Sequence, residues 1–177
     1  MNDDTRHTRR VYLVGPRASG KTTVGKALAA RARWNFEDTD ATVVATAGMT
    51  VEQIVEREGW EGFRRRETEA LRATLGRDGL VVATGGGMVL AEENRRMLRN
   101  GGLVAYLCGS VELLAARLAR DPLAAQRPSL TGRPIADEVA EVLTVREPLY
   151  RECADVVLDA GDEVPMLVDR LADLLEG

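Results

Sequence analysis

One eight-residue stretch constrains the fold of this chain more than any other. Residues 15–22 read G-P-R-A-S-G-K-T, which matches in full the pattern G-x-x-x-x-G-K-[ST] of a phosphate-binding loop. An apolar, β-prone stretch over 11–14 precedes it, and a helix-forming stretch over 23–33 follows it. The sequence therefore predicts a strand–loop–helix unit that binds a nucleoside triphosphate.

The residues of this loop have distinct physical tasks. Gly15 and Gly20 allow backbone dihedrals that a side chain forbids, so successive N–H groups can turn onto phosphate oxygens. The N-terminus of the next helix adds free N–H groups and a positive dipole end. Lys21 supplies a charge for the β- and γ-phosphates, and the Thr22 hydroxyl is placed to ligate Mg²⁺. The expected nucleotide contacts are Gly15, Pro16, Arg17, Ala18, Ser19, Gly20, Lys21, Thr22 and Thr23.

The composition fits one globular domain. The chain has 177 residues, of which 45% are hydrophobic and 29% charged, and its net charge is −4. We expect a disordered lead-in over 1–9 and a single domain over 10–177, and the charge argues against nucleic-acid binding through a general positive field. Since no apolar run approaches the roughly 18–20 residues of a membrane span and the N-terminus is polar, we expect a cytoplasmic protein.

Histidine and cysteine narrow the chemistry. The single histidine, His7, lies in the lead-in, which removes serine–histidine–aspartate hydrolysis, histidine zinc sites and histidine acid–base catalysis. Cys108 and Cys153 stand in apolar surroundings without metal-ligand spacing, and this favours free thiols in a reducing cytosol over a disulfide. Any reaction must therefore use Asp, Glu, Lys, Arg, backbone amides and a metal.

Short apolar runs alternate with helical patterns along the chain. Strands are predicted over 10–14, 34–37, 80–84, 103–107 and 155–158. Helices are predicted near 21–33, 41–47, 51–59, 61–75, 91–99, 111–120, 136–151 and 163–176. This alternation predicts an α/β fold, a parallel sheet covered on both faces, with ligands at the carboxyl ends of the strands. Three prolines and a glycine make residues 121–134 the predicted mobile loop.

Two carboxylates follow the second predicted strand. Asp38 and Asp40 flank Thr39, and alternation points both of them out of the strand end, at the edge where the phosphate-binding loop lies. Phosphoryl transfer needs one carboxylate near a metal and another that holds or deprotonates the attacking hydroxyl. Helix capping explains the triplet equally well, because Asp is a favoured N-cap residue.

Glycines and arginines supply the remaining candidates. The three glycines at 85–87, directly after a predicted strand, can offer bare amides to an anion or form a plain flexible turn. Arg64, Glu67 and Arg146 lie on charged helices, as does Arg151, and solvent-exposed surface is the ordinary expectation for them. Arg127 lies in the proline-rich loop instead, and a loop arginine can close over a phosphate.

Together these motifs resemble those of the shikimate kinases. In that family's order the chain carries G-P-R-A-S-G-K-T, D-T-D, E-G-W-E-G-F-R-R-R-E, V-A-T-G-G-G, R-P-S-L-T-G and R-E-P-L-Y. The likeness spans residues 11–165 and is nearest to the type II isoenzymes over T-V-E-Q-I-V-E-R-E-G-W-E-G-F-R. The loop alone is shared by very many proteins, whereas D-x-D, F-R-x-x-E and G-G-G at these spacings are far more specific. A mild departure is Ser129, where a second leucine is common.

The resemblance implies a fold and an acceptor site. The implied fold is that of a nucleoside-monophosphate-kinase-like P-loop protein, with a five-stranded parallel sheet flanked by helices and a mobile lid over 121–134. Asp40 would hold the ring hydroxyls of shikimate, and Arg64 and Arg146 its carboxylate. Asp38 would hold Mg²⁺ through water, beside Thr22. Backbone amides would line the same pocket at Gly85, Gly86 and Gly87.

The nucleotide side is implied in the same way. Lys21 and the lid residue Arg127 would stabilise charge on the transferring phosphoryl group, and with Asp40 they are the expected catalytic residues. Arg117 matches the family's adenine-stacking arginine, with Arg120 as a rival. A proline on the other face of the adenine corresponds to Pro165.

The expected activity is transfer of the γ-phosphoryl group of ATP to the 3-hydroxyl of shikimate, by a monomer that acts in aromatic amino-acid biosynthesis with no nucleic-acid or membrane partner. Asp40 either removes the hydroxyl proton or only orients the hydroxyl. The alternatives are a kinase for another small polyol acid such as gluconate, a nucleoside-monophosphate kinase, and a P-loop module that binds nucleotide without turnover.

Overall fold

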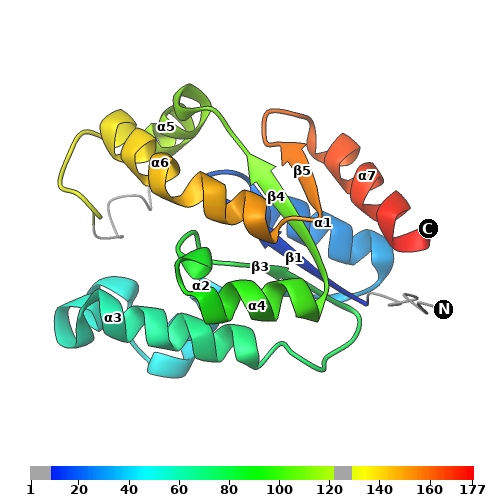
Figure 1. The fold of residues 1–177 in the computed structure, drawn as a ribbon, viewed down its shortest axis with the longest axis horizontal. Helices are drawn as coiled ribbons and strands as arrows, with labels where there is room; N and C mark the ends of the chain where they lie inside the picture. Colours follow the sequence, from blue (N-terminus) through cyan, green and yellow to red (C-terminus); the bar gives the residue numbers. More distant parts are fainter. Residues whose placement is uncertain (1–8, 122–128) are drawn as a thin grey trace.

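The computed structural model describes residues 9–121 and 129–177. Strands and helices alternate along the chain, as predicted (Figure 1). The elements are β1 (Arg10–Val14), α1 (Lys21–Ala32), β2 (Asn35–Asp38), α2 (Thr39–Ala47), α3 (Val51–Arg72), β3 (Leu80–Ala83), the 3₁₀ turn η1 (Met88–Leu90), α4 (Glu92–Gly101), β4 (Leu103–Cys108), α5 (Val111–Arg120), α6 (Ile135–Cys153), β5 (Val156–Asp159) and α7 (Val164–Glu176).

The strands of the described residues form one five-stranded sheet in the order β2-β3-β1-β4-β5. Every neighbouring pair is parallel, and Val11 of the central strand β1 is in register with Val81 of β3 and Leu103 of β4. The chain builds β2 and β3 on one side of β1, and β4 and β5 on the other. The carboxyl end of β1 is therefore the switch point at which open α/β sheets bind ligands, and the predicted fold class is confirmed.

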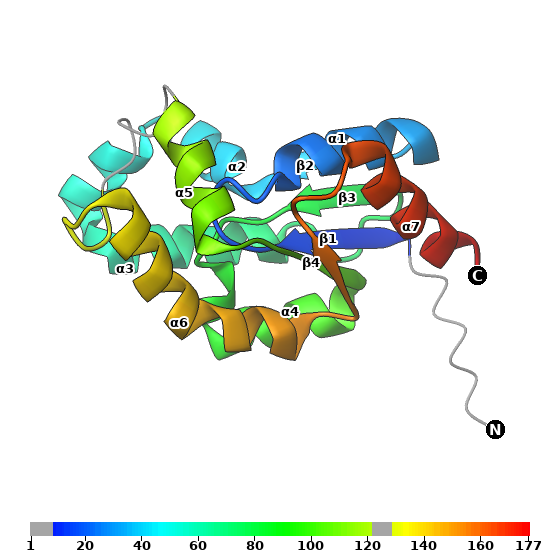
Figure 2. The same ribbon diagram turned by 90° about the horizontal axis from the view of Figure 1, so that it is seen from above.

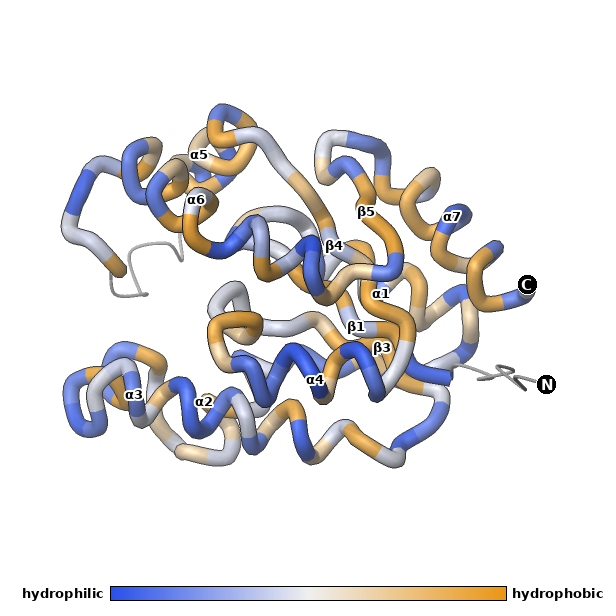
Figure 3. Tube along the Cα trace, in the orientation of Figure 1, coloured by the Kyte–Doolittle hydropathy of each residue, from blue (hydrophilic) through white to orange (hydrophobic). Residues whose placement is uncertain are grey.

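The alternation of side chains along β1 divides the core into two layers. Val11 and Leu13 pack with α1 and α7, whereas Tyr12 and Val14 pack with α4 and α6. Figure 2 shows these two helix pairs on opposite faces of the sheet, and Figure 3 shows α4 as mostly hydrophilic. Because burial of each such apolar side chain contributes roughly 1.5–3 kcal/mol, β1 is a rigid base for the loop that follows it.

Two helix starts show how local side chains set boundaries. The predicted capping box at Thr50 is present: Gln53 N donates to Thr50 Oγ1 at 3.2 Å, and Thr50 N donates to Gln53 Oε1 at 3.0 Å. Helix α2 begins two residues earlier than predicted, because Oδ1 of Asp38 accepts from the backbone N–H groups of Asp40 and Ala41, at 2.9 and 3.2 Å. Asp38 is thus the N-cap residue of α2.

Helix α3 contains a kink in place of the predicted break between two helices. Gly59 has φ 69° and ψ 176°, and the helix continues on both sides of it. Glu58 and Arg66 bridge the kink, since Nε and Nη2 of Arg66 donate to the two carboxylate oxygens of Glu58 at 2.9 and 2.7 Å. The 3₁₀ turn η1 was not predicted.

Several other predictions concern the periphery. The thiols of Cys108 and Cys153 are free, and the latter is buried. None of the described helices has the length and apolar character needed to cross a membrane. Arg9 is already joined to the sheet, since its carbonyl oxygen accepts from Gly79 N at 2.7 Å. Residues 1–8 of the predicted lead-in and residues 122–128 of the predicted lid, which include Arg127, lie outside the described residues.

Candidate active site

The phosphate-binding loop joins β1 to α1 at the carboxyl edge of the sheet. Gly15 and Gly20 both have positive φ, 147° and 96°, so the predicted need for glycine is confirmed. A Cβ on Gly15 would lie 2.7 Å from the carbonyl oxygen of Leu107, because the loop lies directly against β4. Gly20 caps α1 without a side-chain hydrogen bond, and the first turn holds no acidic residue. The N–H groups of this turn are therefore available to an anion.

A cavity of about 820 Å³, called the loop cavity below, opens beside this loop. Its described lining includes Arg17, Ala18, Gly20, Lys21, Thr22, Thr23, Asp38 and Asp40. Nζ of Lys21 donates to the carbonyl oxygens of Gly15 and Pro16 at 2.7 and 2.8 Å. Oγ1 of Thr22 donates to Oδ2 of Asp38 at 3.0 Å. A cation, a hydroxyl and a carboxylate thus border one space at the N-terminus of α1.

Arg117 connects this loop to the far side of the sheet. Its Nη1 donates to the carbonyl oxygen of Ala18 at 3.1 Å and its Nη2 to that of Ala160 at 2.8 Å. Arg120, the rival candidate, is exposed at the end of α5. Pro165 is exposed in the first turn of α7 and lies outside the cavity linings found among the described residues. Arg117 therefore contacts the phosphate-binding loop, whereas Pro165 lines none of the three cavities described here.

A second cavity, of about 50 Å³ and called the inner cavity below, lies next to the loop cavity. Its lining comes from segments that are far apart in the sequence: the loop, α2, α3, the glycine turn and α6. The described residues that border it are Arg17, Asp40, Val51, Trp60, Phe63, Arg64, Glu67, Gly86, Gly87, Leu130 and Arg146. The D-T-D, F-R-x-x-E, G-G-G and R-E-P-L-Y motifs therefore meet around one space.

Arg64 and Glu67 face the inner cavity, so the expectation of solvent-exposed surface is wrong for both. Nη1 of Arg64 donates to Oε2 of Glu67 at 2.6 Å, and the guanidinium lies 5.4 Å from the ring centroids of Trp60 and Phe63. Glu67 is only 1% exposed. Burial raises the pKa of its carboxyl to about 6, against the opposing effect of the Arg64 charge.

The glycine turn after β3 explains this burial. A Cβ on Gly85 would collide with the carboxylates of Glu67 and Asp40, and a Cβ on Gly87 would overlap the guanidinium of Arg64. The backbone of the turn thus approaches these charged groups more closely than any side chain would allow. The N–H of Gly85 donates to a buried hydroxyl on α2, so the turn is held in place. The alternative of a plain flexible turn is therefore wrong.

The two carboxylates of the D-T-D triplet have different surroundings. One oxygen of Asp38 caps α2, which is the capping alternative left open by the sequence, and the other oxygen accepts from Thr22. Asp40 lies in the first turn of α2 and lines both the loop cavity and the inner cavity. It is therefore on the boundary between the two spaces.

Helix α6 contributes one buried and one exposed arginine. Arg146 is only 8% exposed, so its expected surface position is wrong, whereas Arg151 is exposed as expected and pairs with Glu147 at 2.9 Å. Four residues beyond Arg146, the hydroxyl of Tyr150 donates to the carbonyl oxygen of Gly86 at 2.5 Å. Burial raises the pKa of that hydroxyl to about 12. The contact of Tyr150 with the glycine turn keeps this part of α6 at the cavity.

Four residues near the inner cavity were not assigned to a site from the sequence, namely Trp60, Phe63, Glu67 and Tyr150. Spacing is the signal that could have found two of them, because Glu67 follows Arg64 by three residues and Tyr150 follows Arg146 by four, and residues so spaced share a helix face. The two aromatic residues carry no comparable signal, because core packing explains them equally well.

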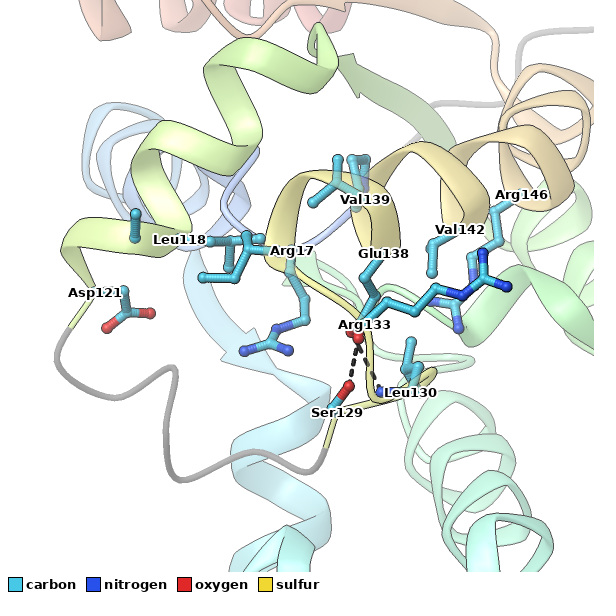
Figure 4. Close-up of a pocket in the computed structure, with 13 residues that line it drawn as sticks. Arg17, Leu118, Asp121, Ser129, Leu130, Arg133, Glu138, Val139, Val142 and Arg146 are labelled. Carbon is cyan, nitrogen blue, oxygen red and sulfur yellow. Dashed lines mark hydrogen bonds between the residues drawn. The ribbon is translucent and has the colours of Figure 1, made fainter.

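A third cavity, of about 390 Å³ and called the outer cavity below, lies between α5, α6 and the segment 129–131 (Figure 4). Glu138 holds this segment: its carboxylate accepts from Leu130 N at 3.2 Å, from Thr131 Oγ1 at 3.1 Å and from the Ser129 hydroxyl. Burial alone would raise the pKa of Glu138, but these hydrogen bonds stabilise the charged carboxylate more strongly, so its pKa is lowered. Ser129, the position that departs from the family pattern, thus has a defined partner, and Leu130 lines both the inner and the outer cavity.

A phosphate-binding loop on a parallel sheet, beside a cavity lined by a boundary carboxylate and two arginines, defines a nucleotide-dependent phosphotransferase with the P-loop kinase fold. Within this class the chain belongs to the shikimate kinase family, whose family model matches residues 17–176. Members of the family are ATP-dependent phosphotransferases that act on a hydroxyl group, and this chain is one of them.

Individual relatives agree with this assignment. Shikimate kinase 2 from Syntrophotalea carbinolica is 53% identical over 96% of this chain and 98% of that relative. Shikimate kinase from Nitratidesulfovibrio vulgaris is 52% identical over 94% of this chain and 95% of that relative. The solved structure of shikimate kinase from Acinetobacter baumannii in complex with shikimate aligns with a TM-score of 0.88 and 37% identity, over 95% of this chain and 93% of that one. The predicted family and function are confirmed.

Proposed function

We propose that ATP occupies the loop cavity, that shikimate occupies the inner cavity, and that the γ-phosphoryl group passes between them to the 3-hydroxyl of shikimate. The observation that carries this proposal is the position of Asp40, which lines both cavities. A carboxylate on that boundary can reach an acceptor hydroxyl while a phosphate chain lies on its other side. In-line phosphoryl transfer needs the acceptor hydroxyl and the γ-phosphate to be held on either side of one boundary.

The charges of the inner cavity fit the acceptor. Shikimate has one carboxylate and three hydroxyls; a forked guanidinium suits the former and an acceptor carboxylate suits the latter. Arg64 and Arg146 both border the cavity, and the bond of Arg64 to Glu67 fixes the direction of its guanidinium. We assign the acceptor carboxylate to these two arginines and the ring hydroxyls to Asp40. The backbone of Gly86 and Gly87 borders the same cavity, and we assign Gly85, the first residue of this turn, to the site with them.

The loop fits the phosphate chain of ATP. Nζ of Lys21 donates to two loop carbonyls and can exchange them for β- and γ-phosphate oxygens. We assign the phosphates to the loop residues from Gly15 to Thr23. The contact of Arg117 with the loop supports Arg117 rather than Arg120 as the adenine-stacking residue. The assignments of Pro165 to the adenine and of Arg127 to the transferring phosphoryl group rest on the family resemblance.

Thr22 and Asp38 fit Mg²⁺. Their oxygens border the loop cavity 3.0 Å apart, and the second oxygen of Asp38 is held at the start of α2. The described residues contain no group of three or more His, Cys, Asp or Glu side chains that could hold a metal. This donor set suits an ion that takes one or two carboxylates and completes its shell with water and substrate phosphates. When bound, Mg²⁺ would neutralise charge on the β- and γ-phosphates.

The proposed reaction divides its tasks among residues of the chain. Asp40 orients the 3-hydroxyl and accepts its proton as the bond from that oxygen to the γ-phosphorus forms. The bond from this phosphorus to the oxygen that bridges it to the β-phosphate breaks, and ADP carries away the electron pair. Lys21 and Arg127 stabilise the charge that develops on the transferring group. The proton then leaves Asp40 for the solvent.

We further propose that this enzyme acts in the cytoplasm as a monomer, with a single domain over 10–177 and without a nucleic-acid or membrane partner. The net charge of −4 and the two free thiols support this setting. The disordered lead-in expected over 1–9 would end before Arg9, which is joined to the sheet. Size-exclusion chromatography with light scattering tests the oligomeric state.

A coupled assay of ADP release tests the proposed reaction. ATP is supplied with shikimate, gluconate or AMP as the acceptor, and the Lys21→Ala variant serves as the inactive control. We expect ADP release with shikimate alone. Release with gluconate or AMP but without shikimate would contradict the assignment of the inner cavity. Tight binding of ATP with no release for any acceptor would indicate a nucleotide-binding module.

A further inference from the structure

Arg17, the third residue of the phosphate-binding loop, stands where the cavities meet. It lines the loop, inner and outer cavities, and no other residue in the described part of the chain lines all three. The loop and inner cavities share Arg17, Asp40, Val51 and Gly86. A phosphoryl group that passes from the loop cavity to the inner cavity must cross this boundary. Of the four described residues that the two cavities share, Arg17 is the one with a cationic side chain.

The backbone around Arg17 determines where its side chain begins. A Cβ on Gly86 would lie 3.6 Å from the backbone nitrogen of Arg17, so the loop is in close contact with the glycine turn. Ala18 has φ 64°, a left-handed conformation that is costly for a residue with a Cβ. The carbonyl of Ala18 is held in this conformation by Arg117, at 3.1 Å. The start of the Arg17 side chain is thus fixed on both sides, and Figure 4 shows it pointing away from the loop into the outer cavity.

The other cations leave room for a second guanidinium at the transferring phosphoryl group, beside the Arg127 that we assigned there from the family resemblance. Lys21 is a point charge at the nucleotide side of the boundary, and we assigned Arg64 and Arg146 to the acceptor carboxylate. The transferring phosphoryl group spreads negative charge over three equatorial oxygens, and these face the walls of the cavity rather than the attacking and leaving oxygens. A planar guanidinium can hold two such oxygens at once, which an ammonium cannot.

We propose that the side chain of Arg17 binds the phosphoryl group while it is transferred and then binds the phosphate of the product, so that Arg17 is a catalytic residue in addition to its backbone contribution to the loop. This inference rests on the proposed function of the two cavities. Arg17 takes up no proton in the step, because a guanidinium stays protonated throughout. Its contribution is electrostatic and is absent when the acceptor carries no phosphate.

The test compares Arg17→Met and Arg17→Lys with the wild type. Arg133→Met is the matched control, because Arg133 lines the outer cavity but neither of the others and is 63% exposed. Turnover is measured by ADP release, affinities for shikimate and shikimate 3-phosphate by calorimetry, and folding by thermal unfolding. We expect Arg17→Met to lower kcat about 100-fold. It should weaken shikimate 3-phosphate binding about tenfold, while shikimate binding changes by less than about threefold.

Arg17→Lys should restore part of kcat, and Arg133→Met should resemble the wild type. Turnover of Arg17→Met within about threefold of the wild type would overturn the inference. Equal losses of affinity for shikimate and its 3-phosphate would also overturn it, because the side chain would then support the loop rather than contact phosphate. A Lys21→Ala variant that retained turnover would instead refute the proposed function, and this inference with it.

Discussion

The loop cavity and the inner cavity share a boundary but are constructed in opposite ways. The loop cavity takes its proposed phosphate-binding groups from consecutive residues, largely from backbone N–H groups and one lysine. The inner cavity takes its groups from residues spread between Arg17 and Arg146, which the fold brings to one edge of the parallel sheet. A phosphate site can therefore be built from consecutive residues, whereas recognition of a particular acceptor needs residues that are far apart in the sequence.

The two cavities also differ in how deeply their charges are buried. Lys21 is half-buried and bonds to carbonyl oxygens, whereas Glu67 and Arg146 are almost completely buried. A buried charge depends strongly on its partners, because solvent cannot replace a lost hydrogen bond. Substitutions in the loop cavity should therefore affect catalysis with little effect on folding, and those in the inner cavity should affect acceptor binding, pH dependence and stability.

Lys21→Ala provides the largest contrast between turnover and stability. We expect kcat to fall about 1,000-fold, because a positioned charge on the phosphoryl group is lost. The melting temperature should change little, since Lys21 is only half-buried and lies in the phosphate-binding loop at the edge of the cavity rather than in the core. Lys26→Ala, an exposed substitution on the same helix, is the matched control for assays of ADP release and thermal unfolding. Near-normal turnover of Lys21→Ala would contradict the proposed function.

Asp40→Asn tests the boundary between the two cavities. The change keeps one acceptor oxygen and removes charge and basicity, so we expect kcat to fall about 100-fold while ATP binding is retained. Steady-state kinetics and calorimetric titration with an ATP analogue measure the two effects. If only the affinity for shikimate changes, Asp40 orients the hydroxyl and is not the base.

Glu67→Gln tests the effect of burial on titration. Since the pKa of Glu67 is raised to about 6 in the folded protein, the folded state holds this proton more tightly than the unfolded chain, where the value is 4.5. The resulting stabilisation is fully present below pH 4.5 and is lost as the pH rises through 6. Relative to the wild type, Glu67→Gln should gain about 2 kcal/mol of unfolding free energy between pH 4 and pH 8.

Urea unfolding at a series of pH values measures this difference, because effects common to both proteins cancel. Glu147→Gln is the control, since that carboxylate is on the exposed side of α6 and pairs with Arg151. A constant difference between Glu67→Gln and the wild type over this range would show that the Glu67 carboxyl has no raised pKa in the folded protein.

Arg64→Ala and Arg146→Ala test the acceptor side. A charge-assisted hydrogen bond contributes about 1.5–3 kcal/mol, so each change should weaken shikimate binding roughly tenfold or more while ATP binding changes little. Arg65→Ala is the matched control on α3, because Arg65 is 63% exposed and pairs with the 90% exposed Glu61. Equal loss of affinity for both ligands would indicate a structural function of these arginines.

Prediction from the sequence succeeded for short segments whose conformation depends on residues close together in the chain. The phosphate-binding loop needs glycine at two positions of positive φ, and the capping box needs Thr50 and Gln53 three residues apart. The alternation of strands and helices similarly determines the parallel sheet, since parallel neighbours need crossover connections. These features depend on residues that are neighbours in the chain, so they can be predicted from the sequence.

Prediction failed where a distant backbone decides the environment of a side chain. Arg64 and Arg146 resemble ordinary helix-surface arginines, because the charged residues around each of them are typical of exposed helices. Their burial depends on the glycine turn at Gly86 and Gly87, which packs against both helices. The spacing of residues along each helix does not predict its contact with the glycine turn. Only the family resemblance assigned these arginines to a site.

The α/β alternation, the phosphate-binding loop and the family of this protein follow from its amino-acid sequence. The tertiary structure alone decided that Asp40 lies between two cavities, that Glu67 is buried against Arg64, and that Arg17 borders all three spaces among the described residues. The reason is that backbone conformation follows from nearby residues. Burial, pKa and shared cavities depend instead on which segments the sheet brings together at its carboxyl edge.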